Sequence, residues 1–464
     1  MTAHGGGSVV VERRRGRAAA RQRPLVVDAL AALAGLGLGI TVALAITAES
    51  AGSLDAPGGI ATALGRLTGL VAAYAMVVVV LLVSRIPPLE RAIGQDRLVR
   101  WHRTLGPWPL YLLTAHAALI TVGYARAAHD GVLHQLGQLL WTYPGILASA
   151  AGFALLVAAG VSSYRKARRR MAYETWWLVH LYTYLALFLS FSHQVDTGAS
   201  FVGHPTATAW WTALWVGTLA TVVACRIGLP AWRSLRHRLT VESVTAAGPN
   251  AVHVTLRGHA LDRLPVSGGQ FLQWRFLRRG LWWQAHPYSL SAVPHGDTLR
   301  LTVKGLGDHS AGLARLRPGT RVAVEGPYGA LTPDTAERER GRGRGPRILL
   351  VGAGLGAAPV HALLQDLPED ADVVALLRAS TRAELVLHDE IAAEMRRRGG
   401  RLHALVGPRE QVPLDAAALE RIAPDLRRRD VYVCGPDGFT AALARTLADA
   451  GVAPSRIHTE QFAF

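Results

Sequence analysis

Long apolar stretches separated by short polar segments fill the first half of the chain. A helix that crosses a bilayer needs about 20 mainly apolar residues. Six stretches meet that length, at roughly residues 25–47, 60–83, 105–125, 144–164, 173–195 and 207–229. The pattern therefore predicts a six-helix transmembrane bundle over residues 25–230. The Arg-rich and Gly-rich residues 1–24 resemble the start of a signal peptide, but the apolar run that follows is too long for one, so we expect a disordered basic tail and a retained first helix.

In the second half of the chain, the apolar segments are shorter. Apolar and polar residues alternate over residues 239–244, 252–256, 271–276, 299–303 and 322–325, which predicts an antiparallel β-barrel domain at 236–331. The charged, Gly-rich and Arg-rich segment 332–345 is expected to be a linker. Strand-like and helix-like patterns then alternate, with buried strands at 348–351, 373–377 and 431–434. This part predicts an α/β doubly wound nucleotide-binding domain at 346–464.

Charge decides how the chain is oriented. The net charge is +17, and the Lys and Arg residues gather before the first apolar stretch, between the second and third, between the fourth and fifth, and after the sixth. The positive-inside rule then places the N-terminus and everything after residue 230 in the cytoplasm of a multi-pass cell-membrane protein. The partner that explains the charge is a lipid bilayer, and no nucleic acid is expected. Two cysteines exclude a disulfide framework and a four-thiolate iron–sulfur cluster within this chain.

Four histidines fall in or beside the third and fifth apolar stretches, where ionisable side chains indicate function. They are His102 and His116, then His180 and His193. Both stretches run from inside to outside, so the pairs His102/His180 and His116/His193 define two levels about 20 Å apart. Two b-type haems, each held by two imidazoles, fit this arrangement. A spacing of thirteen misses one face of a straight helix, so the second pair requires overwinding or a helix end near Ser190 and Ser192.

A glycine-rich loop follows the strand at 348–351. Its residues are Gly352, Gly354, Gly356 and Pro359. Glycines admit a pyrophosphate close to the backbone, and the next helix supplies its N-terminal amides. The loop therefore predicts a dinucleotide site. The segment from Arg378 to Arg382 lacks an acidic residue, which favours NADPH over NADH, although NADH remains possible.

Several motifs together resemble one family. His102 to Gly106 through His116, and Tyr173 to Trp177 through His180 and His193, resemble the transmembrane domain of the ferric reductase/NADPH oxidase superfamily. The segments His286–Ser291, Cys434–Pro436 and Glu460–Phe464 resemble the ferredoxin-NADP reductase-like module fused to it.

The resemblance implies roles for individual residues. FAD would contact His286, Pro287, Tyr288 and Ser289, with the Tyr288 ring against the isoalloxazine, and its diphosphate would lie against Lys304, Gly307, His309 and Ser310. Cys434 and Gly435 would flank the nicotinamide, and Phe464 would cover the flavin until the nicotinamide displaces it. Ser289, Cys434 and Phe464 are the expected catalytic residues, and the four histidines would ligate the haem irons.

The resemblance also implies an activity. Electrons would pass from cytoplasmic NAD(P)H through FAD and two haems to a small-molecule acceptor outside, either ferric iron or molecular oxygen, with a quinone or a periplasmic redox protein as lesser alternatives. A membrane-tethered NAD(P)H:flavin reductase serving a separate redox partner, and a haem-free channel or sensor, are the competing readings. The sequence leaves partner subunits unknown.

Overall fold

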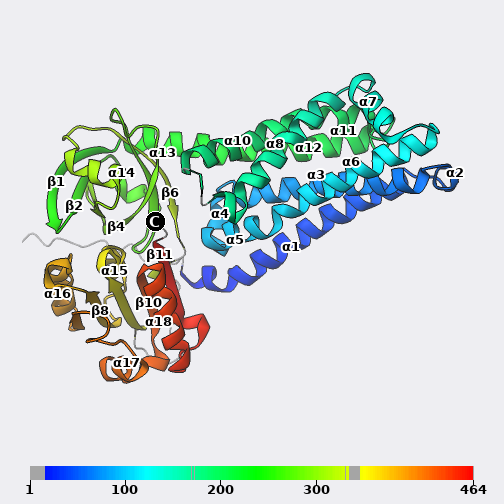
Figure 1. The fold of residues 1–464 in the computed structure, drawn as a ribbon. Coiled ribbons are helices and arrows are strands. Elements are labelled where there is room, and N and C mark those ends of the chain that lie inside the picture. The colour runs from blue at the N-terminus through cyan, green and yellow to red at the C-terminus, as the bar shows by residue number, and fades with distance from the viewer. Residues whose placement is uncertain (1–15, 169, 172, 330, 334–344, 463–464) are drawn as a thin grey trace, which may run out of the picture. The chain divides into compact units, whose positions relative to one another are not determined.

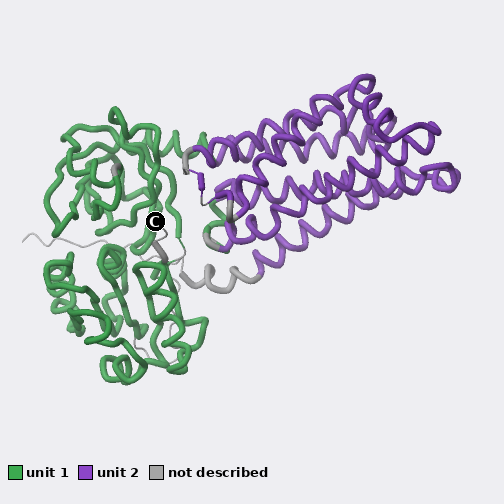
Figure 2. Tube along the Cα trace, in the orientation of Figure 1, with its two compact units in different colours: residues 1–23, 87–95, 226–464 green, residues 24–86, 96–225 purple. Residues whose placement is uncertain are grey.

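The computed structural model describes residues 16–168, 170–171, 173–329, 331–333 and 345–462. The chain divides into two compact units, one of residues 24–86 and 96–225, the other of residues 1–23, 87–95 and 226–464 (Figure 2). Each unit is described by itself. Most of the expected linker, residues 334–344, and the first fifteen residues of the expected tail lie outside the described part of the chain.

The first unit is helical (Figure 1). Its elements are α1 (Gly16–Thr47), α2 (Ala51–Asp55), α3 (Gly59–Leu82), α5 (Gln95–Leu105), α6 (Pro107–Ala127), α7 (Val132–Thr142), α8 (Ile146–Ser163), α9 (Arg165–Arg168), α10 (Tyr173–Leu189), α11 (Phe191–Thr197) and α12 (Pro205–Val223). Helix α3 packs along α6, and α10 packs along α8. Helix α1 begins at Gly16, earlier than the apolar pattern predicts, so the last residues of the expected basic tail are helical.

Five helical stretches among the described residues are long and apolar enough to cross a membrane: Leu25–Thr47, Gly59–Leu82, Arg97–Ala127, Ile146–Ser163 and Pro205–His237. The predicted span at 173–195 is the exception. Its helix α10 has 17 residues and ends at Leu189, where Ser190 separates it from α11. The Ser190 hydroxyl donates to the Leu187 carbonyl at 3.1 Å, which supplies a side-chain partner to a carbonyl at the helix end.

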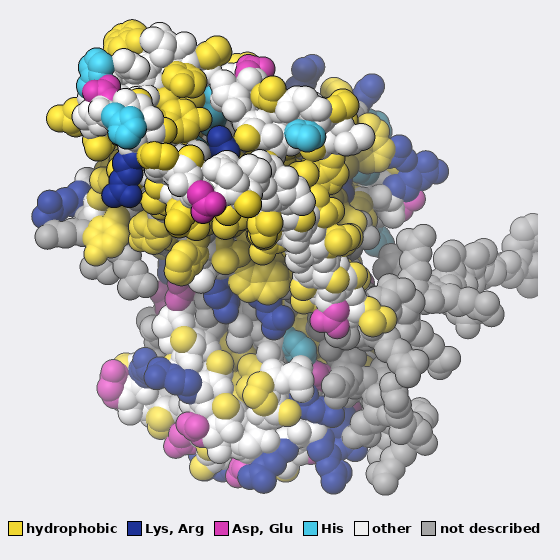
Figure 3. All heavy atoms as spheres, turned by 90° about the vertical axis from the view of Figure 1, so that its right-hand side faces the viewer, with side chains coloured by type: hydrophobic (Ala, Val, Ile, Leu, Met, Phe, Trp, Pro, Cys, Tyr) yellow, Lys and Arg dark blue, Asp and Glu magenta, His cyan; other side chains and the backbone are white. Residues whose placement is uncertain are grey.

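Large apolar side chains are exposed on the helical unit. Hydrophobic atoms cover much of its surface (Figure 3). Leu33, Phe188 and Leu219 have exposed fractions of 64%, 76% and 59%. Apolar patches of this kind are rare on soluble monomers and suit contact with lipid chains. The unit is therefore the helical region of a membrane protein.

The second unit contains an antiparallel sheet of six strands. They are β1 (Thr240–Gly248), β2 (Ala251–Arg257), β3 (Phe271–Phe276), β4 (His286–His295), β5 (Thr298–Lys304) and β6 (Val322–Tyr328), in the order β1-β2-β5-β4-β3-β6. A bridge between Thr240 and Arg321 joins the two edges of the sheet. Alternate residues on β3 point into the core, as Leu272, Trp274 and Phe276 are fully buried. The five predicted strands are present, and β4 is additional.

The same unit contains a five-stranded parallel sheet. Its strands are β7 (Arg347–Ala353), β8 (Asp372–Ala379), β9 (Arg401–Val406), β10 (Asp430–Pro436) and β11 (Ile457–Phe462), in the order β11-β10-β7-β8-β9. Apolar side chains of α15 (Ala357–Asp366) and α16 (His388–Arg397) belong to the core on one face of the sheet. Those of α17 (Ala416–Ile422) and α18 (Asp437–Asp449) belong to the core on the other. Helices on both faces make this the doubly wound sheet that the sequence predicts.

Shorter elements complete the second unit. They are α4 (Pro87–Ile93), η1 (Ala224–Gly228), α13 (Leu229–His237), η2 (Leu261–Arg263), α14 (Asp308–Gly312), η3 (Leu313–Arg315), η5 (Gly354–Gly356), η6 (Arg382–Glu384), η7 (Leu426–Arg428) and η8 (Pro454–Arg456). The short helix α14 and the turn η5 carry residues of the expected cofactor sites.

Candidate functional site

The first pair of histidines comes together in the helical unit. The ring centroids of His102 on α5 and His180 on α10 lie 6.0 Å apart, with an angle of 76° between the ring planes. Two metal–imidazole bonds of about 2 Å each account for about 4 Å of such a separation. The remainder corresponds to the offset between each ring nitrogen and its centroid. Two histidines at this separation would be close enough to hold one iron together.

The second predicted pair consists of His116 on α6 and His193 on α11. The Nδ1 atom of each of these two histidines has a hydrogen-bond partner on another helix. His116 Nδ1 lies 2.7 Å from the Gly65 carbonyl of α3, and His193 Nδ1 lies 2.7 Å from the Ser149 hydroxyl of α8.

The Nδ1 partners determine which ring nitrogen is available to a metal. His102 Nδ1 lies 3.0 Å from the Val79 carbonyl. A carbonyl oxygen only accepts, so Nδ1 of His102 and of His116 carries the proton and donates it. The lone pair of each neutral ring is then on Nε2. This is the tautomer that ligates a metal while the outer hydrogen bond orients the ring.

A glycine makes room for one of these rings. A Cβ atom added at Gly69 would lie 2.5 Å from His116 Nδ1. Real side chains do not approach so closely, so α3 needs glycine at this position for His116 to keep its orientation.

Both histidine-bearing segments are interrupted between their two histidines. Helix α5 gives way to α6 at Gly106, with Pro107 at the start of α6, and α10 gives way to α11 at Ser190. The helix end expected near Ser190 is therefore observed, and it resolves the misfit of the thirteen-residue spacing. Among the residues that the structure describes, no group of three or more His, Cys, Asp or Glu side chains could hold a metal ion. The imidazoles of His102 and His180 would suit a haem held by two histidines.

The expected flavin site gathers on β4 and α14. The rings of His286 and His309 stack with their centroids 3.6 Å apart, and Tyr288 Oη lies 3.2 Å from His309 Nδ1. Trp274 Nε1 donates to the Tyr288 carbonyl at 2.9 Å, which anchors the strand that also carries Pro287. Burial raises the pKa of Tyr288, so its hydroxyl keeps its proton.

His309 has an unused nitrogen. Burial, with a smaller contribution from His286, lowers the pKa of His309 to about 4. The ring is therefore neutral at physiological pH. Its Nε2 is buried and has no hydrogen-bond partner among the described residues. When Tyr288 donates to Nδ1, Nε2 carries the proton and can donate to a nucleotide oxygen, which suits the predicted contact with FAD.

The rest of the expected diphosphate segment is arranged differently. The Ser310 hydroxyl accepts the backbone N–H groups of Leu306 at 2.9 Å and Gly307 at 3.1 Å, so it braces the loop. Lys304 forms an ion pair with Glu384 at 3.6 Å. Space beside Gly307 is open, because an added Cβ would meet nothing within 4 Å.

The expected nicotinamide side brings three buried groups together. Cys434 on β10 pairs in register with Glu460 on β11, and the hydroxyl of buried Ser289 donates to Glu460 Oε1 at 3.4 Å. Burial, and secondarily the charge of Glu460, raises the pKa of the Cys434 thiol well above its usual range. The thiol is therefore protonated. Phe464 lies beyond the last residue that the structure describes.

The glycine loop has the form that a pyrophosphate requires. Gly354 has a φ of 55° and open space where a Cβ would be. A Cβ on Gly356 would lie 2.0 Å from the Cys434 carbonyl, so glycine allows the loop to approach β10, near Gly435. A Cβ on Gly352 would lie 3.1 Å from the Ala357 amide, and Pro359 is buried in α15.

The two arginines that favour NADPH differ in availability. Arg378 Nη1 donates to the carbonyls of Ala379 at 2.8 Å and Leu405 at 3.1 Å, so part of this guanidinium serves the backbone. Arg382 lies on the exposed turn η6. A preference for a 2′-phosphate, as the sequence predicts, would therefore depend mainly on Arg382.

Comparison with known families covers both units. Residues 68–191 match the ferric reductase like transmembrane component, and residues 237–332 match an FAD-binding domain. Together, these two matches correspond to the domain architecture of the ferric reductase/NADPH oxidase superfamily, which the chain resembles over these segments. The first match includes His102, His116 and His180, and it ends two residues before His193. The second includes the whole segment from His286 to Ser310.

Curated relatives resemble parts of this chain. An NADPH oxidoreductase of Mycobacterium tuberculosis is 30% identical over 216 residues, covering 44% of this chain and 54% of the relative. A probable metalloreductase AIM14 of Yarrowia lipolytica is 26% identical over 301 residues, covering 63% of this chain and 50% of the relative. The chain thus spans about half the length of the curated relatives it matches. A solved FAD/NAD-binding domain of a Vibrio cholerae nitric oxide dioxygenase is 23% identical with a TM-score of 0.40, covering 49% of this chain and 99% of that domain.

Sequence reasoning did not identify some residues of the candidate sites. Ser149 and Ser163 on α8 and Gly69 on α3 contact the histidines, and Glu460 contacts Ser289. Serines in apolar stretches are common, so composition does not single them out. A faint signal exists, because Ser149 and Ser163 are fourteen residues apart, as His102 and His116 are.

Proposed function

We propose that this protein is a transmembrane NAD(P)H-dependent oxidoreductase that passes electrons through FAD and two b-type haems to an acceptor on the far side of the membrane. NADPH is the favoured donor, and ferric iron or molecular oxygen the acceptor. One observation carries the proposal. His102 and His116 direct their Nδ1 protons to carbonyls of α3, which leaves both Nε2 atoms available for ligation, and the His102 ring lies 6.0 Å from that of His180.

The flavin half supports the donor side of this proposal. FAD, when bound, converts a hydride into single electrons. Gly354 leaves room for the pyrophosphate, while Tyr288 and Ser289 orient the flavin ring. The protonated Cys434 thiol presents a neutral surface beside the nicotinamide. Ser289 can hold a proton at Oγ, where its bond to Glu460 keeps it.

The helical half supports the acceptor side. His102 with His180, and His116 with His193, would each hold one haem iron and leave it no open coordination position, so an acceptor would receive electrons at the haem edge. The distribution of Lys and Arg favours cytoplasmic flavin and nucleotide domains, which would place the His116/His193 level on the outer side. The lipid bilayer is the partner in this arrangement.

The decisive experiment is an anaerobic reduced-minus-oxidised spectrum of the full chain in detergent after addition of NADPH. A reduced b-haem spectrum is expected, and His116→Ala and His180→Ala should each remove about half of it, because each variant destroys one of two ligand pairs. His134→Ala is the matched control, since His134 is exposed and pairs with Asp130 outside both haem levels.

Two results would contradict the proposal. Flavin bleaching without any haem signal would leave a membrane-tethered flavin reductase that serves another redox partner. Haem spectra that survive both histidine substitutions would assign the ligands elsewhere. Adding oxygen or a ferric chelate separately to the reduced protein then identifies the acceptor by the rate of haem reoxidation.

A further inference from the structure

Helix α8 presents a serine hydroxyl to one histidine of each pair. Ser149 Oγ lies 2.7 Å from His193 Nδ1, and Ser163 Oγ lies 3.4 Å from His180 Nδ1. The other histidine of each pair is held by a carbonyl of α3. All four Nδ1 atoms are thus engaged, two by backbone oxygens and two by hydroxyl oxygens that a single substitution can remove.

The Ser149 hydroxyl has one proton, and its surroundings direct it away from the histidine. Ser149 Oγ donates to the Gly145 carbonyl at 2.9 Å, at the start of α8. The oxygen is then an acceptor toward His193, whose Nδ1 must carry a proton. This leaves the His193 lone pair on Nε2, as in His102 and His116.

Ser163 occupies a more complex environment. Trp176 Nε1 donates to Ser163 Oγ at 3.1 Å, and the Trp176 ring stacks on His180 with centroids 5.3 Å apart and 23° between the planes. Ser163 therefore orients the His180 ring both directly and through Trp176. Its longer contact with His180 is the weaker of the two serine contacts.

We propose that Ser149 and Ser163 are positioning residues that lower the reduction potential of the haem that His193 or His180 binds: Ser149 holds His193 in the ligating tautomer, and Ser163 orients the His180 ring. The inference rests on the proposed function. An acceptor on the Nδ1 proton makes an imidazole a more basic ligand, which stabilises ferric over ferrous iron. Removing the acceptor should therefore raise the potential of one haem and leave the other unchanged.

The test is a spectroelectrochemical titration of the full chain in detergent, with low-temperature EPR of the oxidised haems. Ser149→Ala is expected to shift one of two haem transitions to higher potential and to change one set of EPR g-values. Ser149→Thr should restore both readouts because it keeps the hydroxyl. Ser163→Ala should shift the other transition by less, because its bond is longer.

Ser162 provides the matched control. It is the buried neighbour of Ser163 on α8, and its hydroxyl donates to the Ala159 carbonyl at 2.9 Å. Ser162→Ala should move neither potential.

The outcomes separate this inference from the proposed function. Haem in every variant with both potentials unchanged would overturn the role of the serines and leave the electron path intact. A wild-type chain without haem would overturn the proposed function itself. If Ser149→Ala loses one haem, its retention in Ser149→Thr supports the positioning role, and its loss in Ser149→Thr as well contradicts that role.

Discussion

Gly69 lies against the His116 ring, and the contact leaves no space for a side chain. We predict that Gly69→Ala displaces His116 and removes about half of the b-haem absorbance, at a cost of about 1–3 kcal/mol in stability from overpacking. Haem per protein, measured by pyridine haemochrome, checks the prediction. Gly217→Ala is the control, because a Cβ at Gly217 meets nothing within 4 Å. Equal haem in both variants would contradict the role of Gly69.

His309 makes the flavin site sensitive to pH. Its pKa is lowered to about 4, mainly by burial and also by His286, whereas an unfolded histidine has a pKa of about 6.5. The unfolded state therefore binds the proton more readily below pH 6.5. The stability that depends on neutral His309 is complete above pH 6.5 and decreases as the pH falls toward 4.

We predict that the temperature of flavin release decreases between pH 6.5 and pH 4.5, and that His309→Phe reduces this slope while keeping a ring against His286. Flavin fluorescence during heating measures the release. His295→Phe, at an exposed position on β4, controls for the loss of one histidine. An identical slope in His309→Phe and wild type would show that other groups cause the pH dependence.

At the scale of elements, an ion pair connects the barrel to the nucleotide-binding sheet. Arg300 on β5 donates to both oxygens of Glu390 on α16, at 3.2 and 2.6 Å. Beside it, His361 on α15 has Nδ1 2.6 Å from the Ser291 carbonyl on β4. These contacts hold α15, which follows the glycine loop, against the strand that carries Ser289.

We predict that Glu390→Gln slows reduction of the flavin by NADPH about tenfold or more, because a displacement of about 1 Å in such a step can cost up to a hundredfold. Stopped-flow flavin bleaching measures the rate. An unchanged rate with an intact FAD content would show that the ion pair does not align the two cofactors.

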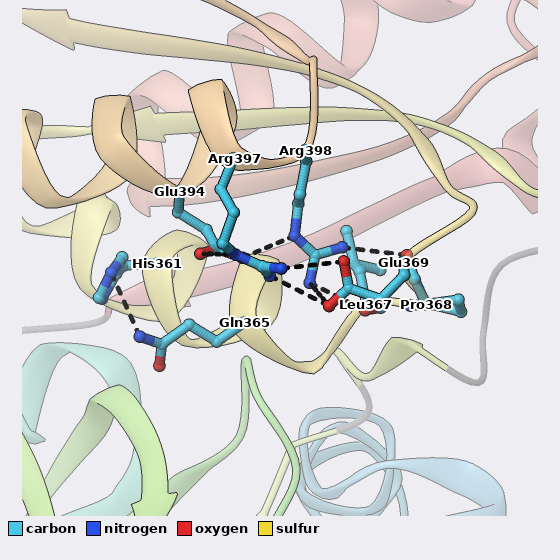
Figure 4. Close-up of polar contacts among 8 residues, drawn as sticks. All are labelled: His361, Gln365, Leu367, Pro368, Glu369, Glu394, Arg397 and Arg398. Carbon is cyan, nitrogen blue, oxygen red and sulfur yellow. Dashed lines mark hydrogen bonds and ion pairs between the residues drawn. The ribbon is translucent and has the colours of Figure 1, made fainter. Parts of the chain in front are cut away.

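A second ion network supplies the control for that prediction. Exposed Arg397 of α16 and exposed Glu369 after α15 form an ion cluster with the less exposed Glu394 and Arg398 (Figure 4). Hydrogen bonds from Arg397, with further ones from Arg398, lower the pKa of Glu394 to about 2. Glu369 pairs only within the nucleotide-binding domain in the described contacts. Glu369→Gln should leave flavin reduction within about twofold of wild type, since exposed ion pairs contribute little.

At the scale of the whole molecule, topology is testable by cysteine labelling. We predict that an impermeant maleimide labels Gly203→Cys in intact cells and labels Gly280→Cys only after the cells are permeabilised. Both glycines have positive φ values and open surroundings, but they lie in the loop before α12 and in the barrel, respectively. The wild-type chain is the control for background labelling of its own cysteines. That background would come from Cys225, because Cys434 is buried. The reverse labelling pattern would invert the proposed orientation.

Much of the architecture could be predicted because its causes are local. Apolar length identified the membrane helices, period-two alternation identified five strands of the barrel, and consecutive apolar residues identified three strands of the parallel sheet. Strand β4 was not predicted because His286, Pro287 and Ser289 interrupt the alternation of apolar and polar residues. The fifth apolar stretch was predicted as one span because hydropathy alone does not detect the interruption at Ser190.

The sequence by itself identified the candidate side chains for the chemistry, since two pairs of histidines in apolar stretches and a glycine loop after a strand are visible in the order of residues along the chain. Only the tertiary structure decided how those side chains are held. His116 depends on a carbonyl 51 residues away, and Ser289 on a carboxylate 171 residues away. Such partners are chosen by packing between distant elements. Tautomer, ring orientation and burial follow from those partners, and spacing along the chain does not encode them.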